Sequence, residues 1–321
     1  QVFPTLCMHW PFVAFAAVYA SPPRPAARME ATRPLAGERT AACPQVAASE
    51  DQARALIHAW NEDKAVCSFS NSGGQFFTKA VSSADGDATL HSTLVWAEGG
   101  GWPSGGARPG VVMVHTAVGP HDLFLRWRAH SLAALGYAVL IADLLGDERG
   151  DGWDPDWASP RRDELHRSGG QGLLRRTKLA QATLVAEGGA LVDGSRVGAI
   201  GFCFGGRAVL DLMRVSPDGL RAVVAFHAIL DPRPPPASTP RARVLVCTAR
   251  GDPFVPKEAV DALVEQLDAA GASYELQLYG GGARHGFSNP AQALNPRPAF
   301  GYDARACRAS WDAATRVLGE E

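Results

Sequence analysis

Three residues that can cooperate in covalent catalysis follow one another along the chain: Cys203, Asp252 and His285. A cysteine thiolate can attack a carbonyl carbon, an imidazole can move the proton, and a carboxylate can orient the imidazole. Each of the three lies shortly after an apolar segment of strand-like composition. Because the carboxyl ends of parallel strands meet at one edge of a sheet, we expect these side chains to converge there.

The surroundings of the cysteine predict a tight turn between a strand and a helix. Cys203 is the central residue of the segment Gly201–Gly206, which reads GFCFGG. The pattern Gly-x-nucleophile-x-Gly is typical of a strained strand-to-helix turn, and residues without a Cβ let the two backbones approach closely. The N-terminus of the following helix favours negative charge and presents amide N–H groups to an oxyanion, that of Phe204 first. The alternative is a glycine-rich strand end with a buried structural cysteine.

The acid and the base each follow a strand-like segment. Asp252 lies directly after the segment 243–249, and Asp231, which also follows a strand-like segment, is the alternative acid. His285 follows the segment 274–280 across a short glycine-rich loop. Of the nine histidines, His285 is therefore the one whose place in the chain favours a catalytic role.

The other histidines and the cysteines do not indicate a metal site. His115, His121 and His227 have no second histidine or acid at metal-ligand spacing, and we expect them to pack or to line a pocket. The six cysteines contain no Cys-x-x-Cys pair and do not cluster, so neither a zinc site nor a dense disulfide framework is expected. We predict no metal and no cofactor.

Strand-like and helical segments alternate along the chain. The alternation predicts an α/β fold with a mostly parallel sheet flanked by helices on both faces, in three layers α/β/α, after an antiparallel entry. The strand-like segments are 75–81, 89–97, 111–115, 137–143, 196–202, 222–230, 243–249 and 274–280. The helical segments are 51–63, 123–135, 173–187, 205–215, 257–270 and 304–318.

Two stretches lack a sustained period. Residues 1–50 are predicted to be a leader or disordered linker, followed by one folded domain over 51–321. The apolar run Trp10–Ala20 is compatible with a secretory signal, a transit segment or a mistranslated leader, which leaves a cytoplasmic, secreted or organellar location open. The polar stretch 145–168 is either a lid over the site or a solvated loop, and we favour the loop.

Charge and hydropathy limit the partners. The formal net charge of -2 supplies no basic field for nucleic acid and no polybasic strip for an anionic membrane, so neither partner is expected. The run Trp10–Ala20 is too short to span a bilayer. We expect a small-molecule partner, and the sequence leaves open whether the chain is a monomer or a homodimer.

Several segments together resemble the dienelactone hydrolase family of α/β hydrolases, also called carboxymethylenebutenolidase-like, over about residues 75–318. They include RPGVVMVHTAVG, VGAIGFCFGGRAVLDL, GDPFVPKEAV and LYGGGARHGFSNP followed by GYDARACRASW. The resemblance implies an α/β-hydrolase fold, a Cys203-His285-Asp252 triad, and an oxyanion hole from the N–H groups of Phe204 and Ala117. It also implies hydrolysis of a small carboxylic ester or lactone through a thioester on the cysteine.

Two positions depart from the family pattern. Thr116 stands where the family usually has a glutamate that holds the resting thiol neutral, so a resting thiolate–imidazolium pair becomes the alternative. Asn289 stands where dienelactone-cleaving members have an arginine that binds the substrate carboxylate, so an arginine from 161–167 or Arg284 would have to replace it. Thr116, Phe254, Phe287 and Asn289 are the pocket candidates; Phe202, Phe204 and Trp127 are further aromatic candidates for walls or core.

Other functions stay open at this point. A catalytically silent binding protein would keep the fold without turnover, and the departures at Thr116 and Asn289 motivate it. A thiol redox sensor would use Cys203, although no resolving cysteine lies nearby in the sequence. A peptidase or lipase is also compatible with the fold, since one fold hosts many chemistries.

Overall fold

The computed structural model describes residues 50–99, 106–146 and 155–320. The predicted leader lies outside this range apart from its last residue. The strands are β1 (Gln75–Asp85), β2 (Ala88–Glu98), β3 (Arg108–Val114), β4 (Ala138–Ala142), β5 (Val192–Phe202), β6 (Leu220–Phe226), β7 (Arg243–Ala249) and β8 (Tyr274–Tyr279). The helices are α1 (Glu50–Asn61), α2 (Lys64–Asn71), α3 (Leu123–Ala134), α4 (Pro155–Gly188), α5 (Phe204–Val215), α6 (Lys257–Ala269) and α7 (Ala304–Gly319), with short 3-10 helices η3 (Gly189–Leu191) and η4 (Pro290–Leu294).

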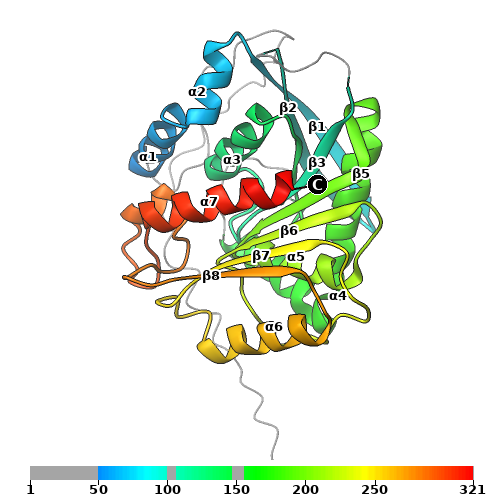
Figure 1. The fold of residues 1–321 in the computed structure, drawn as a ribbon, viewed down its shortest axis with the longest axis vertical. Helices are drawn as coiled ribbons and strands as arrows, with labels where there is room; N and C mark the ends of the chain where they lie inside the picture. Colours follow the sequence, from blue (N-terminus) through cyan, green and yellow to red (C-terminus); the bar gives the residue numbers. More distant parts are fainter. Residues whose placement is uncertain (1–49, 100–105, 147–154, 321) are drawn as a thin grey trace, which may run out of the picture.

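The strands form one mostly parallel sheet in the order β1-β2-β4-β3-β5-β6-β7-β8. Pairing is antiparallel between β1 and β2 and between β2 and β4, and parallel for every pair from β4 to β8 (Figure 1). The predicted antiparallel entry and parallel body are therefore confirmed. The parallel arrangement brings the carboxyl ends of β3, β5, β6, β7 and β8 to one edge.

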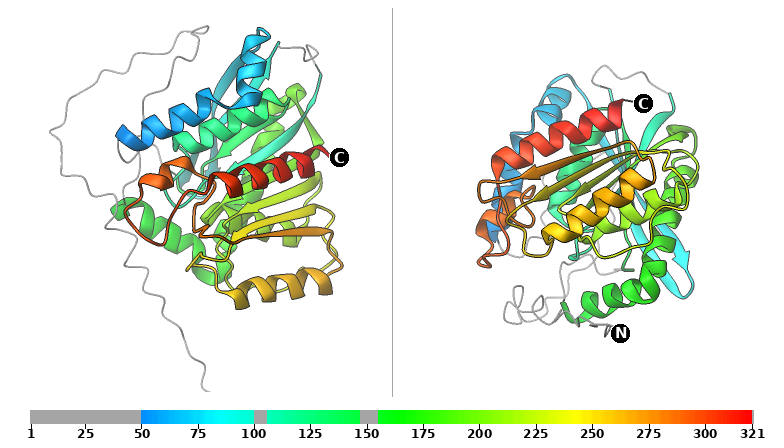
Figure 2. Two further views of the ribbon diagram at one scale, coloured as in Figure 1. Left: turned by 60° about the vertical axis from the view of Figure 1, so that its left-hand side comes forward. Right: turned by 60° about the horizontal axis from the view of Figure 1, so that its bottom comes forward.

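Helices cover both faces of the sheet, which gives the predicted three layers (Figure 2). On one face α1, α2, α3 and α7 contribute to the same core cluster as Val111 and Met113 of β3. On the other face α4, α5 and α6 contribute to the same core cluster as Val112 and Val114 of that strand. Because successive strand residues point to opposite faces, a continuous apolar run is what such a doubly covered strand requires.

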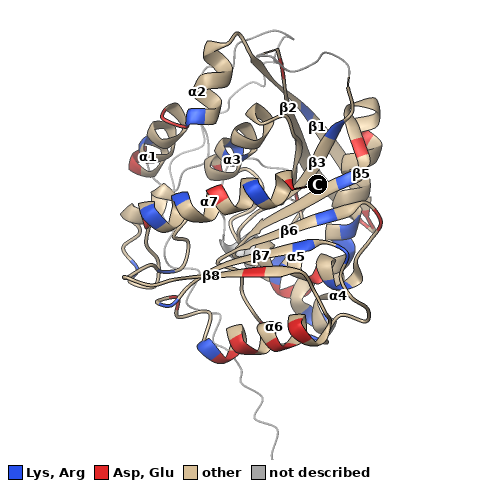
Figure 3. Ribbon diagram, viewed as in Figure 1, with Lys and Arg blue, Asp and Glu red and all other residues tan. Residues whose placement is uncertain are grey.

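In Figure 3 acidic residues predominate along α6, and basic residues predominate along α7. Within the described ranges no helix has the length and apolar character needed to cross a membrane.

Helix α2 was not predicted from the sequence. It is short, and its N-terminus is capped by Asp63, whose carboxylate accepts hydrogen bonds from the amides of Ala65 and Val66 at 3.0 and 3.2 Å. The same carboxylate accepts hydrogen bonds from Trp127 and Ser131 of α3, at 2.9 and 2.7 Å. Contacts between helices therefore stabilise α2, and such contacts leave no local sequence signal.

The prediction of a loop over 145–168 is wrong from residue 155 onward. Helix α4 starts at Pro155, and residues 147–154 lie outside the described ranges. Leu165 of this part of the helix is buried in the core together with Leu173 further along. Two consecutive residues inside α4, Gly169 and Gly170, have positive φ of 70° and 79°. Because this stretch is polar and is followed by two glycines, its sequence shows no clear helical period.

The strand predicted over 222–230 ends earlier, at Phe226. The next residue, His227, has a φ of 38°, which lies in the left-handed region and interrupts the strand. Its amide still donates to the carbonyl of Cys247 on β7 at 2.7 Å. The chain then turns so that the amide of Ile229 donates to the carbonyl of Cys203 at 3.3 Å.

The turn between β5 and α5 has the close backbone approach that the glycine pattern predicts. Cys203 has a φ of 55° and a ψ of -110° and directly precedes α5. A Cβ on Gly201 would lie 2.0 Å from the carbonyl oxygen of Gly205, and a Cβ on Gly205 would lie 2.4 Å from that of Val114. Backbone atoms of β3, β5 and α5 thus meet where only glycine fits.

Substituting Gly205 tests this constraint. In Gly205→Ala the new Cβ must displace the β3 backbone, so we expect the free energy of unfolding to fall by about 3 kcal/mol. Gly280→Ala is the matched control because a Cβ there meets nothing within 4 Å, and it should change stability by less than about 0.5 kcal/mol. Urea unfolding monitored by circular dichroism measures both. Equal stability of the two variants would contradict the close approach.

Candidate active site

The structure brings Asp252 and His285 into direct contact. The Nδ1 atom of His285 lies 2.7 Å from Oδ2 of Asp252. Both residues are buried, with 1% and 3% of their surface exposed. The second carboxylate oxygen accepts the amide of Phe254 at 2.9 Å, which fixes the carboxylate in the loop after β7. The alternative acid, Asp231, instead forms an ion pair with Arg207 and is 42% exposed at its side chain.

Aromatic rings and a backbone bridge hold His285 in place. Its amide donates to Ala299 and its carbonyl accepts from Gly301, both at 3.2 Å. The rings of Phe254 and Phe300 stand nearly perpendicular to the imidazole at centroid distances of 5.0 and 5.4 Å. Phe300 carried no signal in the sequence, because only the bridge across the loop brings it to the histidine.

The backbone places Cys203 at the same edge of the sheet. Its amide donates to the carbonyl of Phe226 at 3.0 Å, and its carbonyl accepts the amide of Arg207 at 3.3 Å. The cysteine is 8% exposed and is not part of a disulfide. The thiol and the imidazole therefore belong to one buried cluster.

The protonation of His285 reflects both neighbours. Burial by itself lowers the pKa of His285, but Cys203 and then Asp252 raise it, to about 10. A cation between two groups that can carry negative charge is stabilised even in a dry site. The direction of this shift favours a protonated imidazole near neutral pH.

The backbone amides of Phe204 and Ala117 are the candidates for an oxyanion hole. Phe204 is the first residue of α5, so its amide has no acceptor within the helix. Ala117 lies in the loop after β3, and no hydrogen bond of the described loop uses its amide. Thr116 beside it is engaged locally, since its hydroxyl accepts the amide of Val118 at 3.3 Å.

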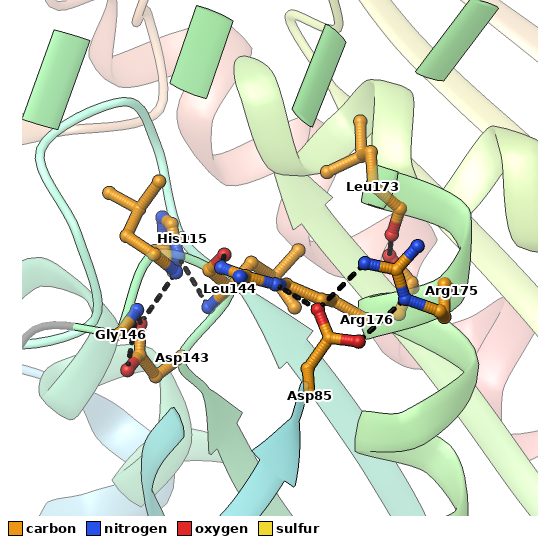
Figure 4. A network of polar contacts seen from close by, with 10 residues as sticks. Asp85, His115, Asp143, Leu144, Gly146, Leu173, Arg175 and Arg176 are labelled. Carbon is orange, nitrogen blue, oxygen red and sulfur yellow. Dashed lines mark hydrogen bonds and ion pairs between the residues drawn. The ribbon is translucent and has the colours of Figure 1, made fainter. Parts of the chain in front are cut away.

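A polar network joins His115, the residue after β3, to the segment that follows β4 (Figure 4). The Nε2 atom of His115 accepts the amide of Leu144 at 3.1 Å, and Arg176 donates to the carbonyl of Leu144 at 2.7 Å. Asp143 accepts the amide of Gly146 at 2.9 Å. Asp85 binds Arg176 at 2.7 Å and also Arg175, and the Arg175 hydrogen bond is the main reason that the pKa of Asp85 is lowered to about 2. His115 therefore links the start of the loop that carries Ala117 to the segment after β4.

Two pocket candidates from the sequence are engaged elsewhere. Phe287 is fully buried in the core, with its ring 5.2 Å from that of Tyr279. Asn289 is buried, and its side chain caps η4 by accepting the amide of Ala291 at 2.9 Å. Phe202 and Trp127 also belong to the core. Phe254 is the candidate whose ring contacts His285, as described above.

Positive charge lies near Phe204. The ring of His166 of α4 contacts that of Phe204 at a centroid distance of 5.4 Å, and its Nδ1 is hydrogen-bonded to Arg207. Burial, followed by the charges of Arg207 and Arg162, lowers the pKa of His166 to about 3. Arg162 is buried, whereas Arg284 is exposed. Of the two alternatives for an arginine that binds a substrate carboxylate, Arg162 is therefore the one inside the protein.

Comparisons with known proteins identify the family. A model of the dienelactone hydrolase family matches residues 101–321. The chain belongs to the dienelactone hydrolase family. Membership makes it a hydrolase of the α/β type, and the eight-stranded sheet has the α/β-hydrolase fold. The resemblance inferred from the motifs is therefore confirmed.

Three similar proteins illustrate the family match. A solved dienelactone hydrolase-like promiscuous phosphotriesterase from metagenomic libraries is 33% identical, with a TM-score of 0.68, over 76% of this chain and 98% of that chain. An uncharacterized protein of Caenorhabditis elegans is 36% identical over 40% of this chain and 82% of its own length. A dienelactone hydrolase of Anabaena variabilis, 22% identical with a TM-score of 0.54 over 76% of this chain and 97% of that chain, shows the fold alone.

The described residues contain no group of three or more His, Cys, Asp or Glu side chains that could hold a metal ion. The candidate site of this dienelactone hydrolase family member brings together a thiol, an imidazole, a carboxylate and backbone amides. These groups supply a nucleophile, a proton carrier and hydrogen-bond donors.

The titration of His285 tests the geometry. Its folded-state pKa of about 10 exceeds the ordinary value of 6.5, so its protonation favours folding below about pH 6.5, and this contribution is lost as the pH rises through about 10. Histidine-selective NMR should find His285 protonated at pH 8. Cys203→Ala and Asp252→Asn should each lower its pKa because each removes a group that raises it. A His285 pKa at or below 6.5 in the wild type would contradict the arrangement.

Proposed function

We propose that the protein hydrolyses small carboxylic esters or lactones through a thioester on Cys203. The observation that carries the proposal is the buried hydrogen bond of 2.7 Å between His285 and Asp252, in a cluster where Cys203 raises the pKa of His285. A base oriented by a carboxylate and coupled to a nucleophile is the arrangement that covalent hydrolysis requires. Family membership supports the hydrolase class, and the substrate is our inference.

The first half-reaction forms the thioester. The Cys203 thiolate attacks the carbonyl carbon, and the carbonyl oxygen takes up the negative charge next to the amides of Phe204 and Ala117. The carbon–oxygen bond to the alcohol then breaks, and the imidazolium of His285 gives its proton to the departing alkoxide. The products of this step are the alcohol, the Cys203 thioester and a neutral imidazole. In a lactone the alcohol stays attached to the acyl group.

The second half-reaction restores the resting state. Neutral His285 takes a proton from water, and the hydroxide attacks the thioester carbonyl. The carbon–sulfur bond breaks, so the carboxylic acid leaves and the thiolate is regenerated beside the imidazolium. Asp252 stabilises the imidazolium in both half-reactions and keeps Nδ1 protonated, which leaves Nε2 for the transfers.

The resting site is proposed to hold a thiolate–imidazolium pair. Thr116, in place of the family glutamate, brings no carboxylate that would compete for the imidazolium, and its hydroxyl is engaged with Val118. The raised pKa of His285 favours the imidazolium half of this pair. The nucleophile is then active before substrate arrives.

The substrate is proposed to carry an anionic group. Asn289 has a neutral amide side chain, and its oxygen is used to cap η4. Arg162 and Arg207 lie around His166, whose ring packs on Phe204, and they are paired with Asp163 and with Asp211 and Asp231. An anionic substrate would replace one of these carboxylates as the partner of an arginine. A carboxylate attached to the acyl part of an ester or lactone is the group that such arginines bind.

Replacing Cys203 tests the proposed nucleophile. Cys203→Ala should reduce kcat/KM for p-nitrophenyl acetate and for a dienelactone by at least about 10³-fold, because no attacking group remains. Cys67→Ala is the control, since Cys67 is a thiol on α2 outside the site. A phosphotriester belongs in the panel, because the relative that is 33% identical is described as a phosphotriesterase.

Three outcomes of that experiment would reject the proposal. Undiminished turnover by Cys203→Ala would show that another group attacks. Lactone binding without turnover of any substrate by the folded wild type would favour a binding protein. Reversible oxidation of Cys203 without turnover would favour a redox sensor.

Replacing Arg162 tests the anionic substrate. Arg162→Gln should raise KM for a carboxylate-bearing lactone about tenfold, since a charge-assisted hydrogen bond is lost, and should leave KM for neutral p-nitrophenyl acetate unchanged. Arg161→Gln is the matched control, because Arg161 is its exposed neighbour on α4. Equal KM values for the lactone in both variants would exclude Arg162 as the anchor.

A further inference from the structure

A second buried histidine packs against His285. The ring centroids of His227 and His285 are 5.2 Å apart, and their planes stand at 66°. On another side His227 contacts the ring of Phe287 at 5.4 Å and 85°. Only 2% of the surface of His227 is exposed. The imidazole of His227 therefore packs directly against the imidazole of His285 and limits the orientations that this ring can adopt.

The backbone at His227 is held in an unfavourable conformation. Its φ of 38° is uncommon for a residue with a Cβ. The amide of His227 donates to Cys247 at 2.7 Å, and the preceding carbonyl, that of Phe226, accepts the amide of Cys203 at 3.0 Å. Strained residues persist where the surroundings fix them, and they cluster at functional sites. The segment Phe226–His227 therefore contacts both the backbone of Cys203 and the ring of His285.

A hydrogen bond fixes the rotation of the His227 ring. Its Nε2 lies 2.9 Å from the hydroxyl of Ser288, three residues after His285. Ser288 is itself held, because its carbonyl accepts the thiol of Cys307 at 3.2 Å and Arg128 at 3.4 Å. The loop that carries His285 therefore also fixes the ring against which His285 packs.

His227 remains uncharged in the pH range of a working site. Burial, followed by the positive charge of His285, holds the pKa of His227 well below its usual value, and its own carbonyl opposes this only in part. The charged or titratable groups around it are His285 with Asp252 beyond, and Arg128 and Cys307 beyond Ser288. A neutral ring adds no charge that would repel the imidazolium.

We propose that His227 is a positioning residue for His285, which through its hydrogen bond to Ser288 keeps the imidazole aligned between Asp252 and Cys203. The proposal rests on the proposed function for its effect on turnover. Its effect on the titration of His285 does not need turnover, so the two proposals can fail separately.

The test compares two substitutions and a control in the full chain. His227→Phe keeps an aromatic ring and removes the hydrogen bond; Ser288→Ala removes the same bond from the other side. We expect each to lower kcat for p-nitrophenyl acetate about tenfold with KM unchanged, and to shift the pKa of His285, measured by NMR, downward. The double variant should be no worse than either single one, because both remove one interaction.

His130→Phe is the matched control. His130 is also buried against aromatic rings, those of Trp60 and Phe76 at 4.6 Å, but it lies on α3 outside the site. It should change neither kcat nor the titration of His285. Circular dichroism checks that every variant is folded.

Two results would overturn the proposal. The first is an unchanged pKa of His285 in folded His227→Phe and in folded Ser288→Ala. The second is additive losses in the double variant, which would mean that the two residues act separately. If the wild type lacks turnover but His227→Phe still lowers the pKa of His285, the proposed function fails and the positioning role stands.

Discussion

The hydrogen bond between Asp252 and His285 is the interaction on which the rest of the site depends. Both groups are removed from water, and burying a charged imidazolium or carboxylate alone is strongly unfavourable. At 2.7 Å each compensates the other, and Phe254 satisfies the second carboxylate oxygen. Cys203 is part of the same balance, because it also raises the pKa of His285. Asp252, His285 and Cys203 therefore stabilise one another in the buried site, and removing one of them destabilises the others.

The parallel sheet places these three residues close together. Parallel pairing of β5, β7 and β8 brings three residues that are far apart in the sequence to one edge. The close approach at Gly205 fixes the turn that presents Cys203. The hydrogen bond between His115 and Leu144 links the start of the loop with Ala117 to the segment after β4. The rigid strand ends therefore position the functional side chains, which lie on the loops that follow the strands.

Much of this could be predicted from the sequence because its signals are local. Apolar runs mark the strands, glycines mark the turn around Cys203, and the positions of Asp252 and His285 after strands indicate their edge. In the structure Asp252 contacts His285, whereas Asp231 pairs with Arg207. The chain order alone did not decide which of the two aspartates lies beside the histidine.

What the sequence did not predict depends on tertiary contacts. Helix α2 is stabilised by contacts between Asp63 and α3. Phe300 reaches His285 only across a backbone bridge. His227 looked like a strand residue, because an apolar run continues through it while its left-handed conformation is imposed by contacts with Cys247 and Ser288. In the same way, Phe287 and Asn289 looked like pocket residues and are engaged in the core and in a helix cap.

The most direct test of the account is to trap the covalent intermediate. The protein is mixed with a p-nitrophenyl ester, quenched in acid within milliseconds, digested and analysed by mass spectrometry. The account predicts one acyl group on the peptide that contains Cys203, released by hydroxylamine as expected for a thioester. An ester that is turned over while Cys203 stays unmodified, or an acyl group found on a different residue, would contradict it.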